Sequence, residues 1–138
     1  MNRYIIDTHV LIWFLEKNSK LLTDIYEDIY YFQHKYYISY LSLMEIDNLR
    51  KTGKIDIRFS LQEILKKLEE SCIDIYFGTV QDVEALDNLE MKIINNKTHG
   101  DYIDRMIIAT AIANRYTCIS ADEKFPYYGK NGLKLLAI

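Results

Sequence analysis

Four acidic residues stand at positions from which a parallel sheet would bring their carboxylates together. Asp7 directly follows the apolar run 4–6, and Asp122 lies just past the run 118–120. Glu45 comes shortly after another such run, and Asp104 lies in the first turn of a long apolar segment. Clustered carboxylates repel one another unless cations neutralise them, so their convergence would imply a bound metal ion.

The residue types favour a hard divalent cation. The four acids offer only oxygen ligands and no Cys or His pattern has metal-binding spacing, which favours Mg²⁺ or Mn²⁺ over Zn²⁺. Divalent ions held by carboxylates suit in-line displacement at phosphorus, because they generate hydroxide and stabilise the leaving oxygen. Such chemistry needs no nucleophilic side chain. In agreement, Cys72 and Cys118 lack an evident His partner, and neither a G-x-S-x-G motif nor a glycine-rich phosphate loop occurs.

Most of these acids also have a structural interpretation. The segments SLME at 42–45 and SADE at 120–123 have the form of a capping box, in which the final Glu returns a hydrogen bond. Asp101 and Asp104 suit an N-cap and a first helical turn, where acids interact favourably with the helix dipole. Asp7 is harder to explain this way, because an unpaired carboxylate at the end of a buried strand is costly.

Short apolar runs alternate along the chain with segments of helical spacing. The runs predict strands and the segments predict helices. This alternation predicts an α/β fold, a three-layer α/β/α sandwich with a central parallel sheet of about five strands. In such sheets the reactive site lies beyond the carboxyl ends of the strands. The expected strands are 4–6, 36–39, 73–77, 117–120 and 133–136, and the expected helices are 8–14 (Thr8 as cap), 21–32, 43–51 (Ser42 as cap), 61–68, 83–89 and 103–114.

Length and composition limit the class of protein. The 138 residues, 49% hydrophobic and 27% charged, suit one domain spanning 1–138 and exclude a disordered chain. No apolar run reaches the roughly 18 residues of a membrane span, and no signal-like segment opens the chain, so we expect a cytoplasmic protein with two buried free thiols. The net charge of −3 disfavours a purely electrostatic nucleic-acid binder but leaves room for an enzyme that acts on nucleic acid.

Three stretches carry a family resemblance: YIIDTHVLIWFL, SYLSLMEI and HGDYIDRMIIATAIANRYTCISADEKFPYYG. The chain resembles the PIN-domain nucleases, most closely the VapC-like toxins of bacterial type II toxin–antitoxin pairs. The family pattern is a strand-ending Asp followed by Ser or Thr, a Glu within S-x-x-E-[IL], an Asp-Arg opening an alanine-containing helix, and a Ser/Thr-x-Asp after the next strand. All four elements occur in this order in the chain. The helices of segments 26–32 and 55–90 resemble those of the family only in general character.

The resemblance implies two kinds of role at these positions. The metal ligands and catalytic residues would be Asp7, Glu45, Asp104 and Asp122. The supporting residues would be Thr8, Ser120, Asp101 and Arg105.

The supporting residues would act in different ways. Thr8 and Ser120 would orient a carboxylate or a metal-bound water, and Asp101 would be an outer-shell ligand. Arg105 would contact a phosphate or form a structural ion pair, and His99 would be structural. Tyr102 stands where the family usually has proline.

The implied activity is a Mg²⁺- or Mn²⁺-dependent ribonuclease that hydrolyses RNA phosphodiester bonds, acting as a toxin with a cognate antitoxin and usually as a homodimer. In this family early helices grip the antitoxin, so the surface of Trp13, Leu22, Ile25 and Ile29 could bury against a partner. Tyr26 and Tyr30 lie four residues apart on a helical stripe with Ile25 and Ile29, which favours core or interface over base stacking.

Two other functions remain open at this point. A PIN-type nuclease could serve RNA processing without an antitoxin, and a catalytically silent α/β module could serve only in binding. A phospho-accepting receiver fits poorly, because Asp7 is followed by Thr-His and Phe77 by Gly-Thr, where paired acids and an acceptor Asp would be needed.

Overall fold

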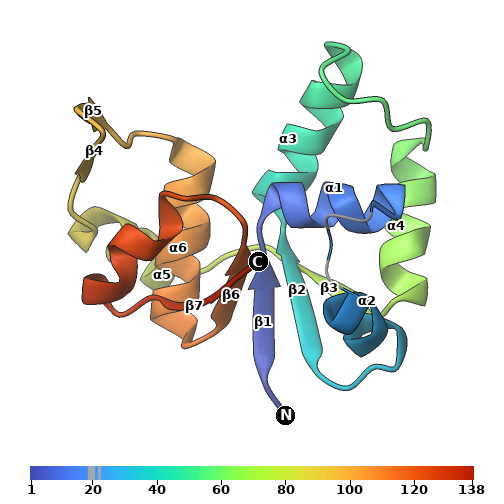
Figure 1. Cartoon of the computed structure of the whole chain (residues 1–138), viewed down its shortest axis with the longest axis horizontal. Helices are drawn as coiled ribbons and strands as arrows, with labels where there is room; N and C mark the ends of the chain where they lie inside the picture. Colours follow the sequence, from blue (N-terminus) through green and yellow to red (C-terminus); the bar gives the residue numbers. More distant parts are fainter. Residues whose placement is uncertain (19–20, 22) are drawn as a thin grey trace.

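The computed structural model of the chain describes residues 1–18, 21 and 23–138, and a five-stranded sheet runs through its centre (Figure 1). The strand order is β3-β2-β1-β6-β7, and each neighbouring pair is parallel. The predicted five-stranded parallel sheet is therefore confirmed. The strands are β1 (Arg3–Ile6), β2 (Lys35–Ser39), β3 (Ile73–Tyr76), β6 (Thr117–Ser120) and β7 (Lys134–Ala137).

Helices cover both faces of this sheet, as expected for a three-layer sandwich (Figure 1). On one face lie α1 (Thr8–Glu16), α2 (Thr23–Tyr30), α3 (Tyr40–Lys51) and α4 (Leu61–Glu70), and on the other lie α5 (Val80–Asn88), α6 (Tyr102–Asn114) and the 3₁₀ helix η1 (Phe125–Asn131).

Neighbouring residues of the central strands supply two separate cores. Ile6 and Ile119 pack in the core beneath α1 to α4, whereas Ile5 and Cys118 pack in the core beneath α6 and η1. Successive side chains of a strand point to opposite faces, so a strand buried on both sides must be apolar at every position. This is why the central strands appear in the sequence as unbroken apolar runs.

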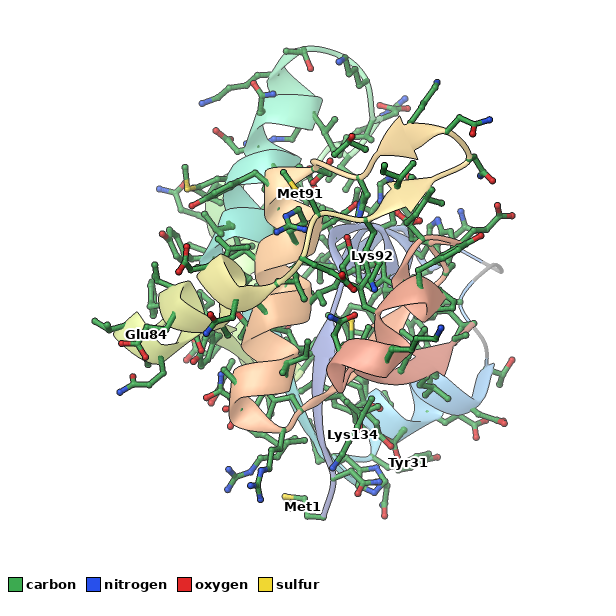
Figure 2. The ribbon with its side chains drawn as sticks, turned by 90° about the vertical axis from the view of Figure 1, so that its left-hand side faces the viewer. Met1, Tyr31, Glu84, Met91, Lys92 and Lys134 are labelled. Atoms are coloured by element: carbon green, nitrogen blue, oxygen red, sulfur yellow. The ribbon has the colours of Figure 1, made fainter. Side chains whose placement is uncertain are left out.

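A short antiparallel hairpin was not predicted. It joins β4 (Ile93–Ile94) to β5 (Lys97–Thr98) through Asn95 and Asn96, whose φ angles of 53° and 64° are left-handed. Two left-handed residues form the tight turn that hairpins prefer, and Asn tolerates this conformation. The labelled Met91 and Lys92 mark the segment that enters the hairpin (Figure 2).

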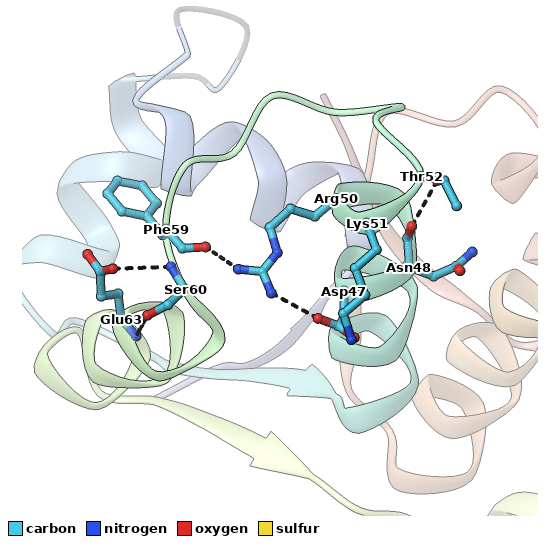
Figure 3. A network of polar contacts seen from close by, with 8 residues as sticks. All are labelled: Asp47, Asn48, Arg50, Lys51, Thr52, Phe59, Ser60 and Glu63. Atoms are coloured by element: carbon cyan, nitrogen blue, oxygen red, sulfur yellow. Dashed lines mark hydrogen bonds and ion pairs between the residues drawn. The ribbon is translucent and has the colours of Figure 1, made fainter.

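The connection from α3 to α4 is fixed by side chains (Figure 3). The Arg50 guanidinium donates to the Phe59 carbonyl, and its Nη2 lies 2.9 Å from Asp47 Oδ1. A capping box starts α4: the Glu63 amide donates to Ser60 Oγ at 3.1 Å, and Glu63 Oε1 accepts from the Ser60 amide at 3.2 Å. The Arg50 contacts attach α3, the helix that carries Glu45, to the segment that leads into α4.

The predicted starts of two helices are wrong. Asp7, rather than Thr8, is the N-cap of α1. Ser39, rather than Ser42, is the N-cap of α3, so Ser42 lies inside the helix and is buried. Several residue types at each boundary are good caps, and spacing alone does not choose among them.

The core interpretation of the stripe that contains Ile25 and Ile29 is confirmed, because both are buried in the core of the chain, which removes them from the predicted partner surface. Tyr30 of the same stripe is exposed, and Leu22 of the predicted partner surface lies outside the described residues. Cys118 is buried as expected, but Cys72 is exposed. Within residues 1–18, 21 and 23–138, no helix has the length and apolar character needed to cross a membrane.

Candidate active site

Asp7 is held at the carboxyl end of β1 by two hydrogen bonds. Its side chain is nearly buried, at 4% exposure. Oδ1 accepts the Val10 amide at 2.9 Å, and Oδ2 accepts the Ser120 hydroxyl. Burial raises the pKa of Asp7, while these two hydrogen bonds lower it. One carboxylate therefore caps α1 and also lines the cleft at this edge of the sheet.

Ser120 connects Asp7 to Asp122. Its Oγ accepts the Asp122 amide at 3.0 Å while its hydroxyl donates to Asp7. Asp122 Oδ1 accepts the Lys124 amide at 2.8 Å and lies 3.5 Å from Lys124 Nζ. The capping-box interpretation of 120–123 is wrong, because Ser120 ends β6 and η1 starts at Phe125 without a side-chain cap.

Asp104 experiences the charges of the other acids. Asp101 is the N-cap of α6, as the structural interpretation predicted, and its Oδ1 accepts the Asp104 amide at 2.9 Å. Burial first, and then the charges of Asp101, Asp122, Asp7 and Glu45, raise the pKa of Asp104 to about 7. The fold therefore brings the four predicted acids close enough to interact electrostatically at one edge of the sheet.

Glu45 lies on α3, one turn beyond a buried hydroxyl pair. Thr8 Oγ1 donates to Ser42 Oγ at 2.9 Å, and both residues are buried. Thr8 thus ties α1 to α3 near Glu45. The capping-box interpretation of 42–45 is wrong, because α3 already begins at Tyr40.

His99 is a buried neighbour of Asp104. Its Nδ1 lies 2.6 Å from the Tyr128 hydroxyl, and its Nε2 lies 3.5 Å from Asp104 Oδ2 with no hydrogen-bond partner among the described residues. Burial lowers the pKa of His99, which favours the neutral ring. If the Tyr128 hydroxyl donates to Nδ1, the ring proton lies on Nε2 and faces the carboxylate. The sequence motif located His99, but this link to Tyr128 was missed because the two residues are far apart in the chain.

Arg105 is buried and makes structural contacts. Its Nη2 donates to the Leu89 carbonyl at 2.8 Å, and its Nη1 donates to the Glu90 carbonyl at 3.1 Å. These contacts join α6 to the segment after α5. Hydrogen bonds to main-chain carbonyls thus stand in place of the expected structural ion pair.

The four carboxylates are suitable ligands for a hard divalent cation, but they are not arranged around one ion position in this structure. Burial first, and then the charges of the neighbouring acids, raise the pKa of Asp104, and a cation would offset the part that comes from those charges. Carboxylate oxygens are the ligands that Mg²⁺ prefers. However, in the part of the chain that the structure describes, no three His, Cys, Asp or Glu residues are arranged to hold an ion. Direct coordination would therefore require the carboxylates to approach one another.

Comparisons with known proteins agree with this fold. Among solved structures, the chain is similar to one from the VapBC2 complex of Rickettsia felis bound to a DNA fragment from its promoter (18% identity, 98% of both chains, TM-score 0.68). It is also similar to a toxin–antitoxin complex from Klebsiella pneumoniae (18% identity, 97% of this chain and 96% of that one, TM-score 0.56). A third similar structure is a PilT N-terminus domain protein from the archaeon Sulfolobus solfataricus P2 (12% identity, 98% and 86%, TM-score 0.52).

No curated protein sequence matches the chain. A family model described as "PIN domain" matches residues 4–131, which is nearly the whole sequence. The chain therefore belongs to the PIN domain family.

Proposed function

We propose that this protein is a Mg²⁺- or Mn²⁺-dependent ribonuclease that hydrolyses RNA phosphodiester bonds. The proposed metal ligands and catalytic residues are Asp7, Glu45, Asp104 and Asp122. The supporting observation is the placement of these acids around Asp104, whose pKa is raised to about 7 first by burial and then by the charges of the neighbouring acids. Carboxylates gathered at buried and half-buried positions are costly without a cation, so their placement at this edge of the sheet favours a metal site.

The chain's own residues would position this chemistry. A bound divalent cation would act as a Lewis acid toward a phosphate group. Ser120 holds one oxygen of Asp7 and the backbone of Asp122, so it orients both acids. Asp101 fixes the first turn of α6, which carries Asp104. The ammonium group of Lys124, 3.5 Å from Asp122 Oδ1, can compensate negative charge on a substrate phosphate.

We further propose that the protein is a cytoplasmic toxin of a type II toxin–antitoxin pair, with an antitoxin partner and a homodimeric state. The similarity to chains of the Rickettsia felis and Klebsiella pneumoniae complexes, over nearly their whole length, supports this role. A PIN-type nuclease of RNA processing is the alternative. A short upstream gene that encodes a DNA-binding antitoxin would favour the toxin.

RNA cleavage with and without Mg²⁺ or Mn²⁺ tests the nuclease proposal. We expect wild-type protein to cleave RNA and the Asp7→Asn variant to be strongly impaired, because Asn keeps the helix cap but loses the charge. Asp87→Asn, at an exposed acid on α5, is the matched control and should cleave like wild type. Equal activity of wild type and Asp7→Asn, or activity unchanged by EDTA, would overturn the metal site. Absence of cleavage in every case would favour a silent binding module.

A further inference from the structure

A cleft of about 450 Å³ adjoins two of the proposed metal ligands. Asp7 and Asp122 line it, and three parts of the fold form its walls: the start of α1, the segment between β6 and η1, and the hairpin residues Ile94 and Asn95. Its volume lies within the range of about 300–1,000 Å³ that is usual for small-molecule sites. The cleft is therefore large enough for a substrate group beyond the scissile phosphate.

Aromatic side chains line the same cleft. Trp13 lies one helical turn after His9 on α1, and both line the cleft, while Val10, Leu11 and Ile12 are buried beneath the helix. Tyr127 lines the cleft from η1 and is 50% exposed, whereas Phe125 and Tyr128 of the same helix are buried. The fold thus presents Trp13 and Tyr127 beside the acids and keeps the neighbouring apolar residues in the core.

A neighbouring cleft, which shares Ile94, Asn95 and Lys124 with the first, has a different character. It has a volume of about 590 Å³ and is lined by Asp101, Asp104, His99 and the basic residues Lys97 and Lys124, with no Phe, Tyr or Trp among its described lining residues. Lys124 lines both clefts. Two aromatic side chains therefore line the first cleft, whereas the second contains two lysines and no described aromatic residue.

We infer that the cleft of Trp13 and Tyr127 binds a nucleobase of single-stranded RNA next to the bond that is cut. This inference rests on the proposed ribonuclease function and adds a base-binding subsite to it. Bases stack on aromatic side chains whatever their sequence, so two aromatic side chains in one cleft suit an unpaired base. The backbone of the same RNA would pass Lys124 toward the second cleft, where Lys97 adds positive charge.

Trp13 allows a direct test because it is the only tryptophan of the chain. Nucleoside monophosphates contain no phosphodiester bond to cut, so they report base binding without turnover. We expect them to quench the tryptophan fluorescence, excited at the red edge of its absorption, while ribose 5-phosphate does not. Purine nucleotides should quench at lower concentration than pyrimidine nucleotides, because their rings stack over a larger area.

Substitutions distinguish a loss of base stacking from a loss of folded structure. Trp13→Leu and Tyr127→Leu should each weaken binding of a short single-stranded RNA by about 5- to 150-fold, measured by anisotropy of a labelled RNA. Trp13→Phe should retain most of the affinity, because it keeps an aromatic ring. Tyr30→Leu, at an exposed aromatic residue on α2 outside the cleft, is the control and should bind like wild type. Trp13 also packs against the core, so thermal unfolding of each variant checks that it is folded.

Equal quenching by nucleotides and ribose 5-phosphate, or wild-type RNA affinity in both leucine variants, would overturn the subsite. These outcomes are distinct from failure of the nuclease proposal. Metal-dependent cleavage without base-specific quenching would leave the nuclease standing and remove the subsite. Base-specific quenching without cleavage would support a nucleotide-binding cleft and remove the nuclease.

Discussion

At the scale of single residues, Asp104 would couple protonation to binding of the proposed metal ion. Its pKa rises from the ordinary 3.8 to about 7, chiefly through burial and then through the neighbouring carboxylates. Between these two values the folded protein holds a proton that the unfolded chain has released. The corresponding stabilisation is complete below 3.8 and is lost as the pH rises through about 7.

Metal-free protein should therefore become less stable as the pH rises across this interval. Asp104→Asn should flatten that part of the profile, because the amide does not titrate. Added Mg²⁺ should stabilise the wild type most at and above pH 7, where the carboxylate is ionised and able to bind. Urea unfolding at a series of pH values, in EDTA and in Mg²⁺, measures both effects. Identical pH profiles of wild type and Asp104→Asn in EDTA would contradict this prediction.

The sequence indicates the acids of the candidate site but not their local contacts. Asp7 was recognisable because a carboxylate at the end of a buried strand requires a partner. Its partner Ser120 is 113 positions away and Ser42 is 34 positions from Thr8, so no local pattern could predict these pairs. Asp7 and Thr8 are both good caps by residue type, and the backbone conformation of Asp7 decides between them.

At the scale of elements, a buried carboxylate joins α5 to α6 and β3. Asp82 is fully buried and accepts hydrogen bonds from the Tyr76 hydroxyl at 2.7 Å, the Thr79 amide at 2.9 Å and Asn114 Nδ2 at 2.8 Å. Both carboxylate oxygens are thus satisfied by donors from three different segments. This network fixes the C-terminal end of α6, the helix whose first turn carries Asp104.

Asp82→Ala should lower the free energy of unfolding by about 3 kcal/mol, because it leaves several buried donors without their acceptor. Asp87→Ala changes an exposed acid of the same helix and should have almost no effect. Urea unfolding of the two variants gives the comparison. A loss of similar size in both variants would show that the buried network does not account for the change.

The sequence predicts some elements of the fold and misses others. The apolar pattern located every strand of the main sheet. It is strongest in the central strands β1 and β6, which are buried on both faces, whereas the edge strands β3 and β7 are more exposed. It missed β4 and β5, whose two residues each are too few for a pattern, although Asn95-Asn96 was an available turn signal. Capping boxes occur at Ser60 and Thr79, whereas the similar segments 42–45 and 120–123 are occupied by site residues.

At the scale of the whole molecule, the net charge alone does not predict whether the protein binds RNA. The chain carries −3 overall, and without the four proposed ligands the remaining residues carry +1. The acids are concentrated at one edge of the sheet, where they would repel an RNA phosphate. Basic residues are dispersed, and several are paired with acids, as Lys51 is with Asp47 and Lys66 is with Glu70.

RNA binding should therefore depend on a divalent cation as strongly as on surface lysines. We expect a hydrolysis-resistant single-stranded RNA to bind weakly in EDTA and more tightly in Mg²⁺, because a bound ion converts a repulsive site into an attractive one. Lys124→Ala should reduce the affinity in Mg²⁺, while Lys66→Ala, on the exposed face of α4, should not. Titrations of labelled RNA at several salt concentrations separate the two contributions, since each lysine–phosphate contact adds about 0.7 to the salt slope for single strands. Equal affinity in EDTA and Mg²⁺ would mean that the acids do not face the RNA, and the binding surface would then have to be sought away from the carboxyl edge of the sheet.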